Sequence, residues 1–110
     1  MPTEDPRPFA TASSGARRYR ATVHPRARTT VVLTASSGSG APAWSVDLFT
    51  DSDSSVDGIG LGAGRGELRV EVVAYRLEDD HETRFVWVFR ENGECMSAPP
   101  GAPPTNVEFG

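Results

Sequence analysis

The most regular alternation of apolar and polar residues lies between Gly66 and Ser97. In residues 67–77 one parity is apolar from Leu68 to Ala74, while the other begins with charged side chains and ends with apolar ones. Residues 84–90 hold five bulky apolar side chains between two arginines. Period-two alternation of β-branched and aromatic residues is typical of strands. We therefore predict two long strands, the second of them central because both of its faces are apolar and need cover.

The link between these strands predicts how they pair. Asp79–Glu82 contains no glycine, which favours a four-residue loop over a tight two-residue turn. That loop sets Val72 opposite Phe89 and Glu71 opposite Arg90. We predict this register because apolar side chains then face apolar ones and an acid faces a base.

A second hairpin follows the first. Asn92 and Gly93 both tolerate positive φ, so they predict a tight turn into a short strand at residues 94–97. The two long strands supply the predicted core, which consists of Val72, Val73, Ala74, Tyr75, Val86, Trp87, Val88 and Phe89.

Three shorter alternating segments precede these hairpins, at residues 17–24, 29–35 and 44–50. No segment repeats apolar residues at helical spacing over ten or more positions. Six short strands separated by turn signals predict an all-β fold, a small antiparallel β-sandwich or partly open barrel with flexible, proline-rich termini.

The length of 110 residues fits one domain. We predict a flexible N-terminal arm at residues 1–15, a single β domain at residues 16–97 and a proline-rich tail at residues 98–110. The last residues of that tail, 105–109, either dock as a short strand or fray.

Composition narrows the setting. Cys95 is the only cysteine, which excludes an internal disulfide, and no apolar run reaches the length of a membrane span. No secretory signal is apparent, so we expect the cytoplasm, or a particle assembled there, and no membrane partner. The absence of lysine beside abundant arginine, alanine, glycine and proline is typical of GC-rich coding and favours a bacterial or phage source.

Glycine occupies every second position from Gly58 to Gly66. Gly58, Gly60 and Ala63 match a dinucleotide-binding fingerprint in form, but that motif needs a following helix, and here a strand follows. We expect a flexible loop instead. If the segment were extended, it would present a bare backbone face that another chain approaches closely.

Candidate metal and catalytic residues are sparse. Asp51 and Asp53 resemble half of a calcium loop, but the later ligand positions do not fit, so a solvated turn is favoured. His24, His81 and Cys95 share no metal-ligand spacing. The sequence therefore marks no catalytic residue, no metal site and no cofactor, and it favours a protein that is not an enzyme.

Charge is strongly segregated along the chain. Residues 1–40 carry six arginines against two acids, a net charge of +4, whereas residues 41–110 carry five arginines against thirteen acids, a net charge of −8. Arginines with an interposed tyrosine can bind polyanions by phosphate contact and stacking. The candidate partner-binding or anion-binding residues are Arg17, Arg18, Tyr19, Arg20, Arg26 and Arg28.

Three functions follow from these patterns. The leading hypothesis is a non-enzymatic protein-interaction or assembly module whose partner is another protein or a second copy. The first alternative is binding of nucleic acid or another polyanion through Arg17–Arg28, which the sequence pI near 5.1 disfavours. The second alternative is a small enzyme or ligand-binding protein with an apolar pocket formed by Trp44, Phe85 and Trp87.

Overall fold

The computed structural model of the chain describes residues 9–24, 26–50 and 55–109, and it is built from antiparallel strands. In chain order the strands are β1 (Phe9–Ser14), β2 (Arg17–His24), β3 (Ala27–Ser37), β4 (Pro42–Phe49), β5 (Ser55–Gly64), β6 (Glu67–Arg76), β7 (His81–Arg90), β8 (Cys95–Ser97) and β9 (Thr105–Phe109). The described residues contain no helix of the length and apolarity needed to cross a membrane.

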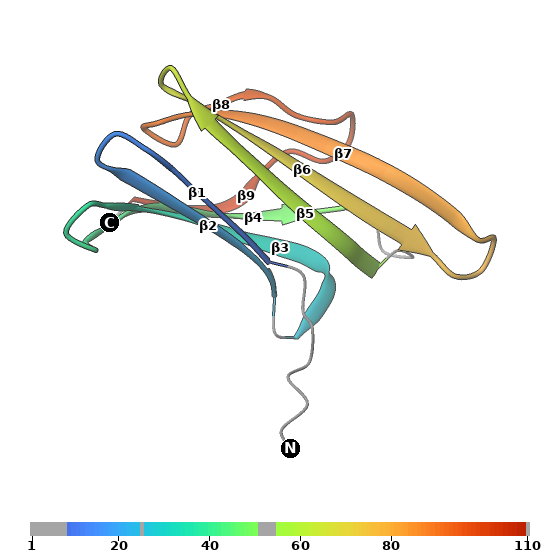
Figure 1. Cartoon of the computed structure of the whole chain (residues 1–110). Coiled ribbons are helices and arrows are strands. Elements are labelled where there is room, and N and C mark those ends of the chain that lie inside the picture. The colour runs from blue at the N-terminus through green and yellow to red at the C-terminus, as the bar shows by residue number, and fades with distance from the viewer. Residues whose placement is uncertain (1–8, 25, 51–54, 110) are drawn as a thin grey trace.

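The strands form two layers, which confirms the predicted β-sandwich (Figure 1). One sheet has five strands in the order β1-β2-β3-β4-β9, and the other has four in the order β5-β6-β7-β8. Along one side of the sandwich the edge strands β1 and β5 lie next to each other. The described residues thus hold three strands beyond the predicted six, namely β1, β5 and β9.

Two of the added strands come from segments for which we predicted no regular structure. Phe9–Ser14, assigned to the N-terminal arm, pairs with β2 as β1, and residues 1–8 of that arm lie outside the described residues. The expectation of a flexible glycine loop is wrong, because Ser55–Gly64 forms β5 along β6. Alternation explains it: Ile59 and Leu61 pack on the core, while the glycines between them occupy the opposite face.

The pairing of β6 with β7 differs from the predicted register. Val72 lies opposite Phe85 rather than Phe89, and Glu67 rather than Glu71 lies opposite Arg90. The pairing is shifted by four residues, an even number, so every side chain keeps its predicted face. The turn therefore comes earlier, at residues 77–80, where Asp80 adopts a positive φ of 54°.

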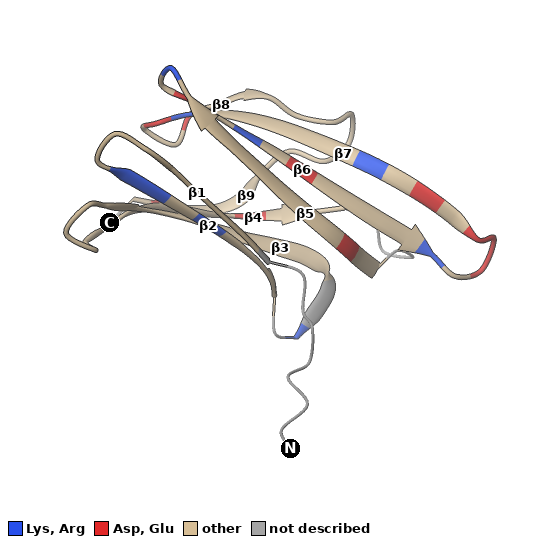
Figure 2. Cartoon of the chain, in the orientation of Figure 1, with Lys and Arg blue, Asp and Glu red and all other residues tan. Residues whose placement is uncertain are grey.

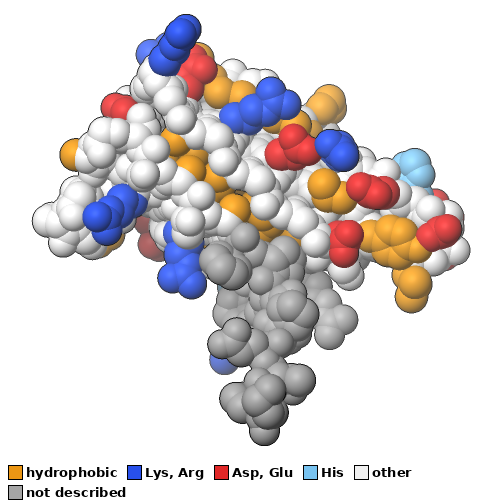
Figure 3. Space-filling model, viewed as in Figure 1, with side chains coloured by type: hydrophobic (Ala, Val, Ile, Leu, Met, Phe, Trp, Pro, Cys, Tyr) orange, Lys and Arg blue, Asp and Glu red, His pale blue; other side chains and the backbone are white. Residues whose placement is uncertain are grey.

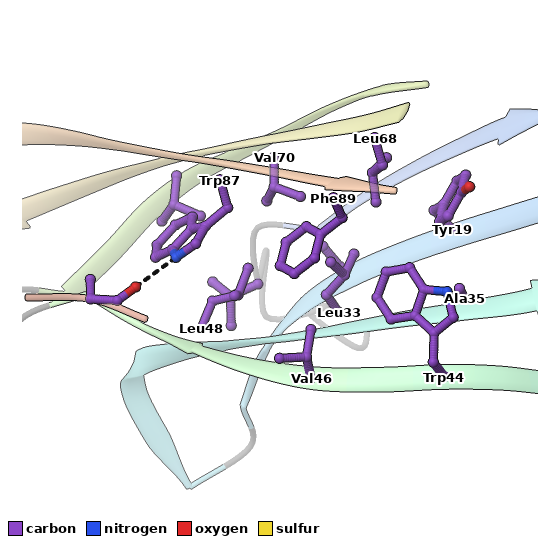
Figure 4. Packing of buried hydrophobic residues seen from close by; sticks show 14 residues of the cluster. Tyr19, Leu33, Ala35, Trp44, Val46, Leu48, Leu68, Val70, Trp87 and Phe89 are labelled. Atoms are coloured by element: carbon purple, nitrogen blue, oxygen red, sulfur yellow. Dashed lines mark hydrogen bonds between the residues drawn. The ribbon is translucent and has the colours of Figure 1, made fainter. Parts of the chain in front are cut away.

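The core lies between the two sheets and is built from one parity of each strand (Figure 4). Of the eight predicted core residues, Val72, Ala74, Trp87 and Phe89 are buried. The other four, Val73, Tyr75, Val86 and Val88, are half-buried on the opposite face of the four-stranded sheet. The expectation that β7 is covered on both sides is wrong within the described residues, because only one layer packs against it.

Two tryptophans tie distant segments together. The buried indole N–H of Trp87 donates a hydrogen bond to the Ala102 carbonyl at 2.8 Å (Figure 4), and that of Trp44 donates one to the Glu91 carbonyl at 2.7 Å. The first bond holds the proline-rich segment that follows β8 against the core. That segment then delivers β9 to the free edge of β4.

Candidate functional site

Two arginines of β2, Arg18 and Arg20, lie on the outer face of the five-stranded sheet, the face turned away from the core. Side chains alternate along this strand, so the exposed Arg18 and Arg20 project to one side and the buried Tyr19 to the other. Tyr19 is only 2% exposed and packs against Trp44, with ring centroids 6.2 Å apart. Its ring therefore points away from the arginine face, although the residue is among those that line a groove on that face, so its part in binding stays a prediction.

Strand register surrounds each of these arginines with hydroxyl side chains. Arg18 lies between Ser13 of β1 and Ser36 of β3, and the next outward residue of β2 repeats the arrangement. The two rows, which we call the arginine rows, are Ser13–Arg18–Ser36 and Thr11–Arg20–Thr34. Because a strand rises about 3.3 Å per residue, the rows are spaced about 7 Å apart.

The arginine rows line a shallow groove with a volume of about 720 Å³. Among the ion pairs within the described residues, none involves Arg18 or Arg20. On the four-stranded sheet Arg84 contacts Glu71 at 2.9 Å and Arg76 contacts Asp79 at 3.1 Å, whereas the exposed Arg69 has no ion pair within the described residues. Two exposed guanidinium groups beside four hydroxyl side chains can bind carboxylates or phosphates.

The same outer face continues across β3 into a second groove, of about 710 Å³. Thr34 and Ser36 line both grooves, and Glu108 and Phe109 of β9 line the far side of the second one. Asp47 lies on this side too, and its carboxylate accepts a hydrogen bond from the Asn106 amide at 2.8 Å. The outer face therefore changes from basic at β2 to acidic at β4 and β9.

The remaining arginines of the predicted stretch are scattered. Arg17 is half-buried at the start of β2, and Arg26 is exposed in the turn before β3, beyond the groove. Arg28 belongs to β3, and its side chain lies outside the described part. Of the six predicted binding residues, Arg18, Tyr19 and Arg20 thus line the groove, and a binding role for the set stays a prediction.

Tyr19 carries an unusual buried group. Its hydroxyl is shielded from solvent and has no hydrogen-bond partner among the described residues. Burial raises the pKa of Tyr19, the Glu91 carboxylate raises it further, and Arg17 opposes both. The phenol is therefore held neutral, which suits a packing residue rather than an acid-base catalyst at neutral pH.

The three aromatic residues of the predicted pocket are part of the packed interior. Trp87 is fully buried, and Phe85 stacks on it with ring centroids 6.0 Å apart. Trp44 packs against Phe89 at 5.6 Å and contributes to the wall of the second groove. Of the three, only Trp44 lines one of the two grooves, so ligand binding in an apolar pocket stays a prediction.

The other candidate residues do not assemble into a reactive centre. His24 ends β2, where its Nδ1 accepts a hydrogen bond from the Arg26 N–H at 3.1 Å, and His81 is exposed at the start of β7. Burial raises the pKa of the Cys95 thiol, and a backbone hydrogen bond with Ser97 opposes that rise. Across residues 9–24, 26–50 and 55–109 no three His, Cys, Asp or Glu side chains gather as metal ligands. Asp51 and Asp53 lie outside the described residues.

The hydroxyl residues of the arginine rows were missed by the sequence analysis. Thr11 and Ser13 belong to β1, which carried no strand signal strong enough to be predicted. The signal that could have found them is the weak alternation of small residues in Phe9–Ser14.

Comparisons with models of protein families, with curated proteins and with solved structures found no match.

Proposed function

We propose that this chain is a non-enzymatic protein-interaction or assembly module that binds a protein partner through the outer face of its five-stranded sheet. One observation supports the proposal above all: two exposed arginines lie in register between hydroxyl residues, with no carboxylate partner among the described residues. On the four-stranded sheet, by comparison, the exposed Arg84 contacts Glu71, and the exposed Arg90 contacts Glu94.

The chemistry of the face suits a polar, specific interface. Guanidinium groups and hydroxyls offer directional hydrogen bonds, and complementary charge governs partner choice and association rate more than affinity. The interior beneath the face is filled by large side chains such as Trp87 and Leu33, which makes the sheet a rigid support. Within the described residues nothing gathers acid, base and nucleophile in one place, so binding is the better-supported role.

Photo-crosslinking in the cells that produce the protein tests this proposal. The crosslinking amino acid p-benzoylphenylalanine would replace Thr34, which is exposed between the two grooves, and in a control it would replace Glu67, exposed on the other sheet. We expect one discrete adduct from position 34, identified by mass spectrometry, and none from position 67.

The adduct should disappear when Arg18→Gln and Arg20→Gln are added to the same protein. Crosslinks of equal yield from both positions, or an adduct that persists without the two arginines, would contradict binding through this face. A folded protein that forms no adduct from position 34 would contradict it as well.

The arginine rows also favour a second candidate function, the binding of nucleic acid or another polyanion. The two rows place guanidinium groups about 7 Å apart along the strand, beside hydroxyls that can donate to phosphate oxygens. A mobility shift at low salt that is lost with Arg18→Ala plus Arg20→Ala would support this function. No shift with single-stranded or double-stranded DNA or RNA would end it.

A further inference from the structure

The hairpin of β6 and β7 ends in an exposed acidic tip at residues 76–82 (Figure 2). These residues carry four carboxylates against one arginine, a net charge of −3. The tip lies at one end of the molecule, whereas the arginine rows of β2 lie toward the other end (Figure 2). Figure 3 shows the same separation on the surface, with acidic side chains gathered at the hairpin end.

Two of the four carboxylates are engaged within the tip itself. Asp79 forms an ion pair with Arg76 at 3.1 Å, and Asp80 accepts a hydrogen bond from the Tyr75 hydroxyl. Glu78 and Glu82 are exposed, and no ion pair within the described residues involves either of them. The tip thus presents two carboxylates of the kind that two guanidinium groups bind well.

Leu77 adds an apolar contact to the same tip. Its side chain is 83% exposed, more than any other large apolar side chain among those described. A protruding leucine beside two exposed acids would bury apolar surface when the tip docks on a partner.

We propose that the acidic tip of one copy of this chain docks on the arginine rows of a second copy. This inference rests on the proposed function, because it names the partner of the same face. Glu78 and Glu82 would each meet one of the two arginines, Arg18 or Arg20, while Leu77 packs on the methyl groups of Thr11 and Thr34. The two unpaired acids of the tip therefore match the two unpaired bases of the groove in number and in sign.

The charge of the whole chain favours a second copy over a polyanion. The net charge is −4, so a phosphate polymer approaching the groove is repelled by most of the molecule. A second copy can present its tip alone, since the tip projects beyond the sandwich (Figure 1). The other acidic side chains of the two copies then stay well separated from one another.

The tip and the groove are different surfaces of one chain, which fixes the type of assembly. Such a contact is head-to-tail, and each added copy leaves one tip and one groove unused. The assembly therefore grows into a ring or an open chain instead of stopping at a symmetric dimer.

Sedimentation velocity with two complementary variants tests this geometry. The groove variant carries Arg18→Gln and Arg20→Gln, and the tip variant carries Glu78→Gln and Glu82→Gln. Matched controls remove the same charges elsewhere, with Arg65→Gln and Arg69→Gln in one protein and Asp57→Asn and Glu67→Gln in another, all at exposed positions.

The wild type and both controls should form oligomers larger than dimers, and each test variant alone should be monomeric. An equal mixture of the two variants should stop at a 1:1 complex, because only one tip and one groove remain functional. Raising salt from about 0.01 M to about 1 M shortens the Debye length from about 30 Å to about 3 Å and should dissociate the wild type.

Other results would overturn the inference. A wild type that stays monomeric at low salt, or variants that assemble as the wild type does, would show that the tip does not dock on the groove. A monomeric wild type that gives a crosslink to another protein from position 34 would retain the proposed function and remove only this partner. A monomeric wild type that gives a salt-sensitive shift with nucleic acid would assign the groove to a polyanion.

Discussion

Trp87 joins the core to the C-terminal segment, and replacing it with phenylalanine should destabilise the protein strongly. The side chain is fully buried, and its N–H donates to the Ala102 carbonyl at 2.8 Å. Trp87→Phe keeps an aromatic ring but leaves that carbonyl without its donor, at a cost of about 1–3 kcal/mol. The smaller ring also leaves an unfilled space, which adds about 1 kcal/mol. We therefore expect the free energy of unfolding to fall by about 2–4 kcal/mol.

Urea denaturation followed by circular dichroism measures this loss, and hydrogen exchange shows where it acts. The amides of β9 should exchange faster in Trp87→Phe, because the bond to Ala102 holds the segment that leads to this strand. Trp44→Phe is the matched control: it also removes an indole bond, but its acceptor at Glu91 is on an exposed residue that water can reach, so we expect a loss of about 1 kcal/mol. If Trp87→Phe loses less than about 0.5 kcal/mol, the bond does not hold the C-terminal segment.

Three further predictions concern backbone, pH and reactivity. An added Cβ at Gly60 meets nothing within 4 Å, so Gly60→Thr should raise the free energy of unfolding by about 0.5–1 kcal/mol. Gly93 has a φ of +93°, and its added Cβ would lie 3.0 Å from the Trp44 ring, so Gly93→Ala should lower the free energy of unfolding by about 1–3 kcal/mol. Urea denaturation measures both variants, and equal effects would contradict the assigned geometry. The folded state raises the pKa of Tyr19 above its ordinary 10.0, so the stability that the neutral phenol contributes is complete below pH 10 and is lost as the pH rises beyond it. Tyr19→Phe should therefore leave stability at pH 7 unchanged or slightly higher and should reduce the loss of stability above pH 10 in thermal melts. An unchanged alkaline loss would refute this. Burial raises the pKa of the Cys95 thiol, so the folded protein should react with iodoacetamide several-fold more slowly than the urea-unfolded chain, and equal rates would show that the thiol is freely accessible.

Alternation predicted which face each side chain of β6 and β7 occupies, but it did not predict their register. A register shift of four residues keeps every side chain on its face, so the hydrophobic pattern alone is satisfied by both pairings. The choice depends on the turn, where the Arg76–Asp79 ion pair and the Tyr75–Asp80 hydrogen bond stabilise residues 77–80. Such local contacts are harder to predict from a sequence than pairs of apolar side chains are.

The missed strands share a different cause. β1 is made largely of small residues, and β5 carries glycine at every second position, so neither has the β-branched or aromatic content that marks a strand. Each is ordered by its partner, β2 or β6, rather than by its own propensity. Two of the four hydroxyl residues of the arginine rows were missed for this reason, since Thr11 and Ser13 lie beside the arginines only when β1 pairs with β2.

The bond between Trp87 and Ala102 also bears on how the chain folds during synthesis. β9 completes the five-stranded sheet at the edge of β4, although half of the chain separates these two strands. A ribosome delivers β4 long before residues 105–109, so the edge of β4 stays open while the second sheet is being made. Over that interval the nascent chain exposes the unpaired edge of β4, and Trp87, once synthesised, lacks its acceptor until Ala102 follows. An unpaired strand edge of this kind is what molecular chaperones protect.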